Sequence, residues 1–385
     1  MKIVVEKKDI LTGIQKASSL TSSKTGTSYL KAIWLEAKDD DRLKIMSTDS
    51  KLEFIGIYPA KVESPGLVGV LGKHFFELLK RLPEDSIVLY LEKESLILEQ
   101  GRRKYKLSVY DPSWFQEFSS PPENLILWSG SILKTIINKT FFTIADEEEE
   151  NLNYLKISSS PEQGYYEACG LNNHQFAMIK FQDEEISSLL GKEGILIAKA
   201  YLSEIKKWIK EEDIYIGINN NRLFLLNKEK TERLSVPLSI GSFPNYNSFL
   251  SKFGAEDNSV MKVNRKEFIE CLQRLLIFNT ETQRCSYFTF KENEVTIYTH
   301  GYDVGEAIEQ LNIEFRGNLK KIVFPTKDLI EILNHFDSDT ICVELTSEQE
   351  PAKFYTEDEI DKNYIVITTP VEVSEEVYYT EEETE

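Results

Sequence analysis

Residues 73–91, KHFFELLKRLPEDSIVLYL, decide the fold, because the same pattern returns twice further along the chain. In each copy an amphipathic helix is followed by an acidic corner and then a strand. The second copy starts at Lys199 (KAYLSEIKKWIKEEDIYIGI) and the third at Thr326 (TKDLIEILNHFDSDTICVEL), so the starts lie 126 and 127 residues apart. Repetition at a period of whole-domain size indicates three tandem copies of one unit.

A second helix repeats on a similar period. It reads DILTGIQKA at Asp9, SILKTIINK at Ser131 and EFIECLQRL at Glu267, and segments with strand-like alternation of apolar residues follow each helix. Each unit is therefore a doubled strand, helix, three-strand motif. We predict an α+β fold with antiparallel sheet, helices on one sheet face, six helices and about two dozen strands. A repeated shell of this kind is suited to enclosing something rather than to building one asymmetric pocket.

Clusters of proline, glycine and polar residues mark two probable joints, at Pro121-Pro122 and at Gly254-Ala255. We predict domains at 1–122, 123–253 and 254–373. The last 12 residues, SEEVYYTEEETE, hold six glutamates and no base, which is typical of a disordered acidic tail at 374–385.

Composition limits the class of protein. No stretch approaches the roughly 20 apolar residues that cross a bilayer, and the start, MKIVVEKKDILTGI, lacks a secretory apolar region. We therefore expect a cytoplasmic protein without membrane contact. The four cysteines are scattered without a CxxC pair and are expected to be buried thiols.

Charge is segregated by element type. The six predicted helices carry a net +8 inside a chain of net charge -19, so the remaining residues carry -27. If the helices line one concave surface, that surface attracts a phosphate backbone while the outer sheets repel it. Lysines on helices would hold double-stranded DNA without choosing a sequence. The lysines expected to face DNA are Lys134, Lys139, Lys199, Lys206 and Lys210.

Three local motifs add a resemblance to a known family. They are Ser242-Phe243-Pro244-Asn245-Tyr246, Leu171-Asn172-Asn173-His174-Gln175-Phe176 and Thr369-Pro370-Val371-Glu372-Val373. In this order, and with the three-unit layout over residues 1–373, they resemble the bacterial sliding clamps, the beta subunits of DNA polymerase III. The resemblance implies a head-to-tail homodimeric ring around duplex DNA. Such a ring tethers the replicative polymerase, does no chemistry and needs no cofactor or metal.

The resemblance also implies site residues. Partner peptides, including those of the polymerase and the clamp loader, would enter a cleft between the second and third domains. Its expected residues are Leu152, Leu171, Asn173, His174, Gln175, Phe176, Pro244, Ser248, Phe249, Pro351, Thr369, Pro370, Val371, Glu372 and Val373. The expected dimer contact joins Tyr105 and Leu107 to Ile277 and Phe278, and Lys24 would be a further DNA contact.

This chain departs from the family in the cleft. Gln175, Ser248 and Glu372 stand where basic residues are common, and Asn173 replaces a common glycine. We infer a cleft that has lost positive charge and hypothesise partner peptides that are less acidic than usual or that bear a basic residue. The acidic tail begins beside the cleft, so it either shields the site or serves only solubility.

Two other classes of function stay open. Abundant carboxylates allow a two-carboxylate hydrolase. However, the acids fall in runs such as Asp39-Asp40-Asp41, which are typical of solvated loops, and the chain holds no GxxxxGK[ST], HExxH, GxSxG or Rossmann glycine motif. The acidic surface also allows a protein-interaction scaffold that never encircles DNA.

Overall fold

A computed structural model describes residues 1–21, 28–149, 151–191, 193–210 and 212–372. The chain divides into two compact units. Unit 1 comprises Met1–Lys134, Glu184–Gly191 and Ala200–Ile240. Unit 2 comprises Thr135–Asp183, Lys192–Lys199 and Gly241–Glu385.

The predicted doubled motif occurs three times. The first repeat runs β1 (Lys2–Glu6), α1 (Lys7–Leu20), β2 (Ala32–Lys38), β3 (Arg42–Thr48), β4 (Glu53–Pro59) and β5 (Lys61–Ser64), then β6 (Gly66–Leu71), α2 (Gly72–Arg81), β7 (Ser86–Glu92), β8 (Ser95–Gln100) and β9 (Arg103–Tyr110). The second runs β10 (Ile126–Ser129), α3 (Gly130–Thr140), β11 (Tyr154–Ser159), β12 (Tyr165–Leu171) and β13 (Gln175–Gln182), then β14 (Ile195–Ala198), α4 (Lys199–Trp208), β15 (Asp213–Asn219), β16 (Arg222–Leu226) and β17 (Glu232–Pro237).

The third repeat follows a short helix α5 (Asn247–Leu250). It runs β18 (Ser259–Asn264), α6 (Arg265–Leu276), β19 (Cys285–Lys291), β20 (Glu294–Gly301), β21 (Gly305–Asn312) and β22 (Glu314–Arg316), then β23 (Lys321–Pro325), α7 (Thr326–Asn334), β24 (Thr340–Leu345), β25 (Ala352–Tyr355) and β26 (Tyr364–Thr368). The α+β prediction is confirmed, as is the threefold repetition of the motif.

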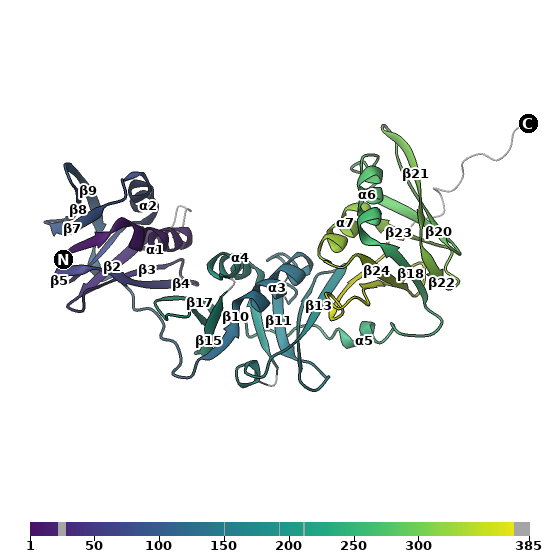
Figure 1. Ribbon diagram of the computed structural model, residues 1–385, viewed down its shortest axis with the longest axis horizontal. Coiled ribbons are helices and arrows are strands. Elements are labelled where there is room, and N and C mark those ends of the chain that lie inside the picture. Colours follow the sequence, from purple (N-terminus) through teal and green to yellow (C-terminus); the bar gives the residue numbers. More distant parts are fainter. Residues whose placement is uncertain (22–27, 150, 192, 211, 373–385) are drawn as a thin grey trace, which may run out of the picture. The chain divides into compact units, whose positions relative to one another are not determined.

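Each unit is built on antiparallel sheet (Figure 1). Unit 1 holds a 13-stranded sheet in the order β10-β15-β16-β17-β4-β3-β2-β6-β9-β8-β7-β1-β5. Unit 2 holds a nine-stranded sheet, β14-β11-β12-β13-β26-β25-β24-β18-β22, and a four-stranded sheet, β21-β20-β19-β23. Because strands from neighbouring repeats share these sheets, each unit takes strands from more than one repeat.

Two strand pairs join neighbouring repeats. In unit 1, β17 of the second repeat pairs with β4 of the first, with Arg233 opposite Ile55. In unit 2, β26 of the third repeat pairs with β13 of the second, with Ile367 opposite Phe176. In both junctions the last strand of one repeat (β17 or β26) pairs with a strand of the repeat before it (β4 or β13). That partner is the third strand after the first helix of its repeat. The junction is therefore a repeated feature, like the helices.

The helices cover one sheet face with apolar stripes. In α1, Ile10, Ile14 and Ala17 are fully buried at helical spacing against β3 and β4. Gly13 lies on the same stripe. Only glycine fits there, because a Cβ would come within 2.2 Å of the Tyr58 ring. α1 packs on α2, and α6 packs on α7.

Two predicted helices are shorter than expected. The helix expected at 131–145 ends at Thr140 and continues as a 3₁₀ turn over Phe141–Thr143. The helix that starts at Lys199 ends at Trp208, so Lys210 lies beyond it and not with Lys199 and Lys206 on the basic stripe that the sequence predicts for this helix.

Candidate functional site

Most of the predicted cleft residues that the structure describes lie around the β12–β13 turn in unit 2. The Asn172 side chain accepts backbone hydrogen bonds from His174 at 2.9 Å and from Gln175 at 2.7 Å, which fixes the turn. The His174 carbonyl accepts from Thr369 N–H at 3.0 Å. This bond brings the segment after β26 alongside the turn, and it leaves the His174 side chain exposed.

An aromatic cluster forms the apolar part of this site. Phe176 is buried, and its ring lies 5.2 Å from that of Tyr246 and 5.3 Å, edge to face, from that of Phe249. Leu171 packs on the same cluster. The sequence predictions thus bring Leu171, Phe176 and Phe249 together in one place. Such a cluster offers the apolar surface that peptide clefts use.

Sequence reasoning missed several members of this cluster. Phe243, Tyr246, Leu250 and Phe253 all come from the segment that follows the second repeat, and they cover the outer sheet face. Their spacing of three and four residues was a visible signal, because apolar residues at this spacing share a face wherever a chain turns helically.

A buried hydrogen bond anchors the cluster. The Tyr246 hydroxyl donates to the carboxylate of Glu167, which is 5% exposed. Burial, followed by the nearby Cys169 and Glu167, raises the pKa of Tyr246 well above its ordinary range, so the phenol keeps its proton. Burial likewise raises the pKa of the Cys169 thiol to about 12. Both groups are structural at neutral pH.

One cation at the cluster was also missed. The Lys156 ammonium lies 5.1 Å from the ring centre of Tyr246 and 5.7 Å from that of Phe243. The substitutions at Gln175, Ser248 and Glu372 remain as predicted departures, but the cluster keeps this base beside its aromatic rings.

The remaining cleft residues differ in exposure. Asn173 is exposed and donates to Glu149 at 2.6 Å, while Ser248 and Glu372 are exposed. Gln175 is only 7% exposed, so its side chain offers little to a ligand. The others are half-buried: Leu152, Pro244, Pro351, Thr369, Pro370 and Val371. Val373 and the DNA-contact candidate Lys24 lie outside the described residues.

Lys139 requires a correction, because it does not face solvent. Its ammonium donates to the carboxylates of Asp337 and Asp361, both at 2.8 Å, and to the His335 carbonyl at 2.6 Å, and the residue is 8% exposed. Asp361 also accepts backbone N–H bonds from Asp337 and Ser338. Three acceptors satisfy the ammonium, so Lys139 braces unit 2 rather than contacting DNA.

Lys199 is corrected for the same reason. Its ammonium donates to the Ile144 carbonyl at 2.6 Å and to Asp146 at 2.9 Å, and it lies 5.4 Å from the ring centre of Phe141. Lys206 and Lys210, by contrast, are exposed, and Lys134 is half-buried. The set of lysines suited to phosphate contact is therefore smaller than the sequence predicted.

The predicted dimer residues lie on the part of β9 that pairs on one side and at the end of helix α6. Tyr105 and Leu107 are half-buried on β9, whose residues 103–108 pair with β8 on one side. Ile277 follows the last residue of α6 and is 72% exposed, and Phe278 is half-buried.

The runs of acidic residues do not form a paired active-site pocket. Asp39, Asp40 and Asp41 are all exposed on the β2–β3 turn. Asp146, Glu147 and Glu148, which precede β11, are also exposed. Among the described residues, no helix is long and apolar enough to cross a membrane. The fold is an array of repeated α+β motifs.

Comparisons with known proteins identify the family. Residues 1–118 match the family model of the DNA polymerase III beta subunit, N-terminal domain, and residues 252–370 match that of its C-terminal domain. The beta sliding clamp of Chlamydia pneumoniae is 23% identical over 356 residues, covering 91% of this chain and 94% of its own length. That of Rickettsia felis is 26% identical over 339 residues, covering 85% and 83%.

Solved structures agree on the fold. The sliding clamp of Caulobacter crescentus aligns with a TM-score of 0.88 at 19% identity, covering 97% of this chain and 100% of its own. The clamp of Bacillus subtilis aligns with a TM-score of 0.87 at 20% identity over the same shares. The chain belongs to the DNA polymerase III beta subunit family, the bacterial DNA sliding clamps. These non-catalytic processivity factors tether a polymerase to DNA.

Proposed function

We propose that two copies of this chain close head to tail into a ring around duplex DNA. The ring slides along DNA without reading sequence. It holds the replicative polymerase and the clamp loader through peptides that enter the cleft of unit 2. The protein acts in the cytoplasm, uses no cofactor and catalyses no reaction.

The observation that carries the ring is the pattern of repeat junctions. β4 and β13 each close a first half-motif, and each pairs with the last strand of the following repeat, β17 and β26. The third repeat has the corresponding strand β21, which lies at the edge of its sheet and, among the described residues, pairs only with β20. The first repeat has the corresponding strand β9. Applying the junction once more pairs β21 of one copy with β9 of another.

Register supports this reading of β9. Tyr105 lies opposite Leu98 on β8, as Leu234 of β17 lies opposite Leu225 on β16. By the same count Leu107 corresponds to Val236. Leu234 and Val236 are 2% and 0% exposed in the internal junction, whereas Tyr105 and Leu107 are half-buried. Pairing with a second copy would bury both side chains in the same way.

The opposite edge is suited to receive β9. Ile277, directly after α6, is 72% exposed, and Ile308 on β21 is 63% exposed. β21 carries Glu306 and Glu309, whereas residues 103–106 of β9 hold three bases. Because the two surfaces differ, the contact is heterologous, and two copies close the ring. Opposite charge favours this pairing over pairing between two like edges.

The DNA-facing set that we propose is Lys134, Lys206 and Lys210, with Lys24 kept as a prediction. Lys206 and Lys210 are exposed, and exposed lysines bind phosphates as point charges, which lets the ring move along the duplex. The overall charge of -19 keeps the rest of the protein from binding DNA.

Topological retention tests the proposal. The protein is loaded onto nicked circular DNA by a clamp loader, gel-filtered at moderate salt, and the DNA is then cut once. A ring stays bound to circular DNA and slides off the ends of linear DNA. Its mass in light scattering is that of two chains. Equal retention on circular and linear DNA would refute the ring. Binding of clamp-motif peptides without retention would favour the scaffold alternative.

A further inference from the structure

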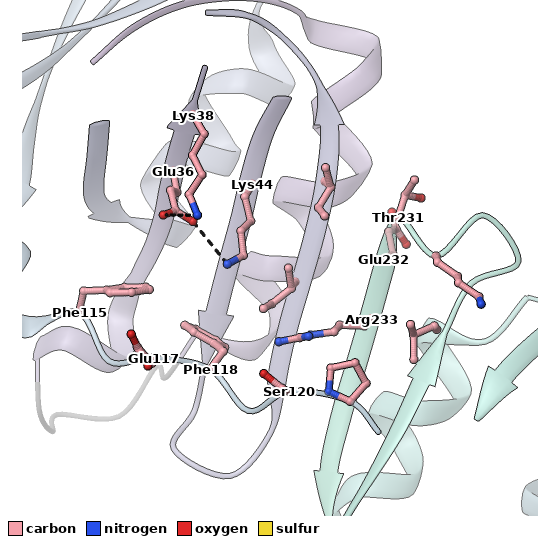
Figure 2. A pocket seen from close by; sticks show the side chains of 15 residues that line it. Glu36, Lys38, Lys44, Phe115, Glu117, Phe118, Ser120, Thr231, Glu232 and Arg233 are labelled. Carbon is pink, nitrogen blue, oxygen red and sulfur yellow. Dashed lines mark hydrogen bonds and ion pairs between the residues drawn. The ribbon is translucent and has the colours of Figure 1, made fainter. Parts of the chain in front are cut away.

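A groove of about 450 Å³ lies in unit 1, within the roughly 300–1,000 Å³ range of ligand sites (Figure 2). It opens on the sheet face opposite α1. Ile55, Ile57 and Leu226 line its apolar part, and Phe115 and Phe118 from the segment after β9 form one wall. None of these residues belongs to the predicted cleft, to the proposed ring contact or to the DNA-facing set.

The polar side of the groove is cationic. Lys38, Lys44, Lys230 and Arg233 line it together with Glu36, Glu117 and Glu232. The Glu36 carboxylate forms ion pairs with both Lys38 and Lys44, and each lysine Nζ lies 3.4 Å from a carboxylate oxygen (Figure 2). The lining therefore carries a net +1, or +2 without Glu232, whose charge is balanced by Lys16, in a chain of net charge -19. Such a local reversal of sign selects for an acidic ligand.

Glu232 does not cancel this charge. Successive residues of a strand face opposite sides of its sheet, and Glu232 turns toward α1. There its carboxylate accepts from Lys16 and, at 2.7 Å, from the Tyr58 hydroxyl. Arg233, the next residue, faces the groove instead.

Arg233 is the group with the clearest need for a partner. It reaches from β17 toward Phe118 and Ser120 (Figure 2), and it donates to the Ser119 carbonyl at 2.5 Å. Among the described residues no ion pair of this guanidinium is found, although the Glu53 carboxylate acts on it electrostatically and opposes the effect of burial on its pKa. A guanidinium has five donors in a planar fork that matches a carboxylate. Burial lowers the pKa of Arg233, which indicates that the cation is partly desolvated.

We propose that this groove is a second docking site, which takes a short segment of a partner protein with an acidic side chain next to an aromatic or aliphatic one. The carboxylate pairs with Arg233, and the apolar side chain lies against Ile57 and the wall formed by Phe115 and Phe118. A nucleic acid backbone offers anions without the apolar side chain, and a small anion leaves the apolar part of the groove uncovered. A peptide uses both halves.

The test uses the full-length protein and a fluorescein-labelled peptide, Gly-Asp-Phe-Leu-Glu-Gly. Its controls are a neutral version with Asn and Gln and an acidic version with Ser in place of Phe and Leu. We expect the acidic aromatic peptide to bind, and both controls to bind at least about tenfold more weakly. Equal binding of either control, or no binding at about 1 mM peptide, would overturn the proposal.

Variants place the peptide in this groove. R233Q should weaken binding at least about tenfold. Two rim substitutions at exposed positions keep the fold: K38E should weaken binding about threefold, and E117K should strengthen it about threefold. The cleft variant F249A should leave it unchanged. If F249A abolishes binding while K38E and E117K do not change it, the peptide sits in the cleft and the inference is wrong. Ring retention on circular DNA is unaffected in either case, so this test fails independently of the proposed function.

Discussion

Replacing Lys139 by methionine should destabilise unit 2 while leaving DNA binding unchanged. The lysine side chain is 10% exposed, and that of Asp361 is 2% exposed. Removing one partner of a buried ion pair costs about 3–5 kcal/mol because the other charge stays buried. Asp361 keeps donors from Asp337 N–H, Ser338 N–H and the Ser338 hydroxyl, so we expect a loss near the lower end, about 3 kcal/mol. Asp337 is 71% exposed and adds little.

Two spectroscopic signals separate the units in a urea titration. All four tryptophans, Trp34, Trp114, Trp128 and Trp208, belong to unit 1, so their fluorescence reports on that unit. Far-ultraviolet circular dichroism reports on both. K139M should lower the urea midpoint of the dichroism change attributable to unit 2 and leave the fluorescence midpoint in place. The matched control is K206M, which changes an exposed lysine and should shift neither midpoint.

Acid titration provides a second arm of the same prediction. Burial by itself raises the pKa of Asp361, but the hydrogen bonds from Lys139, Asp337 and Ser338 outweigh it, so the pKa lies below its ordinary value. A lowered carboxyl pKa adds stability above the unfolded value, about 3.9, and that stability is lost as pH falls through the folded value. D361N should remove this part of the pH dependence. If the K139M protein were as stable as the wild type, the stabilising role of the buried Lys139–Asp361 ion pair would be refuted. Lys139 would then again be a candidate for DNA contact.

Three further predictions concern the other surfaces. Y246F removes the donor to the buried Glu167 carboxylate and should cost about 1–3 kcal/mol, measured by urea unfolding; an unchanged midpoint would count against that hydrogen bond. I277D should dissociate the dimer in light scattering, whereas I360D, at the same 72% exposure, should not. K206A should reduce the slope of log K against log salt for DNA binding by about 0.9, and an unchanged slope would exclude a phosphate contact there.

The repeat and the fold class were predictable from the sequence because they depend on local periodicity. Apolar spacing at Ile10, Ile14 and Ala17 fixes which face of α1 is buried, whatever lies elsewhere in the chain. The three copies of the helix, corner and strand pattern then fix the number of motifs. Helix ends were less predictable: α4 stops at Trp208 although the basic stripe continues to Lys210.

Which lysines face solvent was not predictable, because the answer depends on residues far away in the sequence. Lys139 meets Asp361, 222 residues further on, and no pattern near Lys139 signals that carboxylate. Counting charge on helices therefore overstated the free positive charge. The cleft shows the same limit. The family motifs pointed to Leu171, Phe176 and Phe249, whereas Lys156 joins them only because β11 passes under the aromatic segment.

The central claim is that β9 of one copy pairs with β21 of another, repeating the two internal junctions. Amide hydrogen exchange measures this pairing directly, because a free sheet edge exchanges quickly and a paired edge slowly. In the wild-type protein, peptides covering residues 103–108 and 305–312 should be protected, and dilution or I277D should release both together. Fast exchange at both strands in a protein that is still retained on circular DNA would contradict the account.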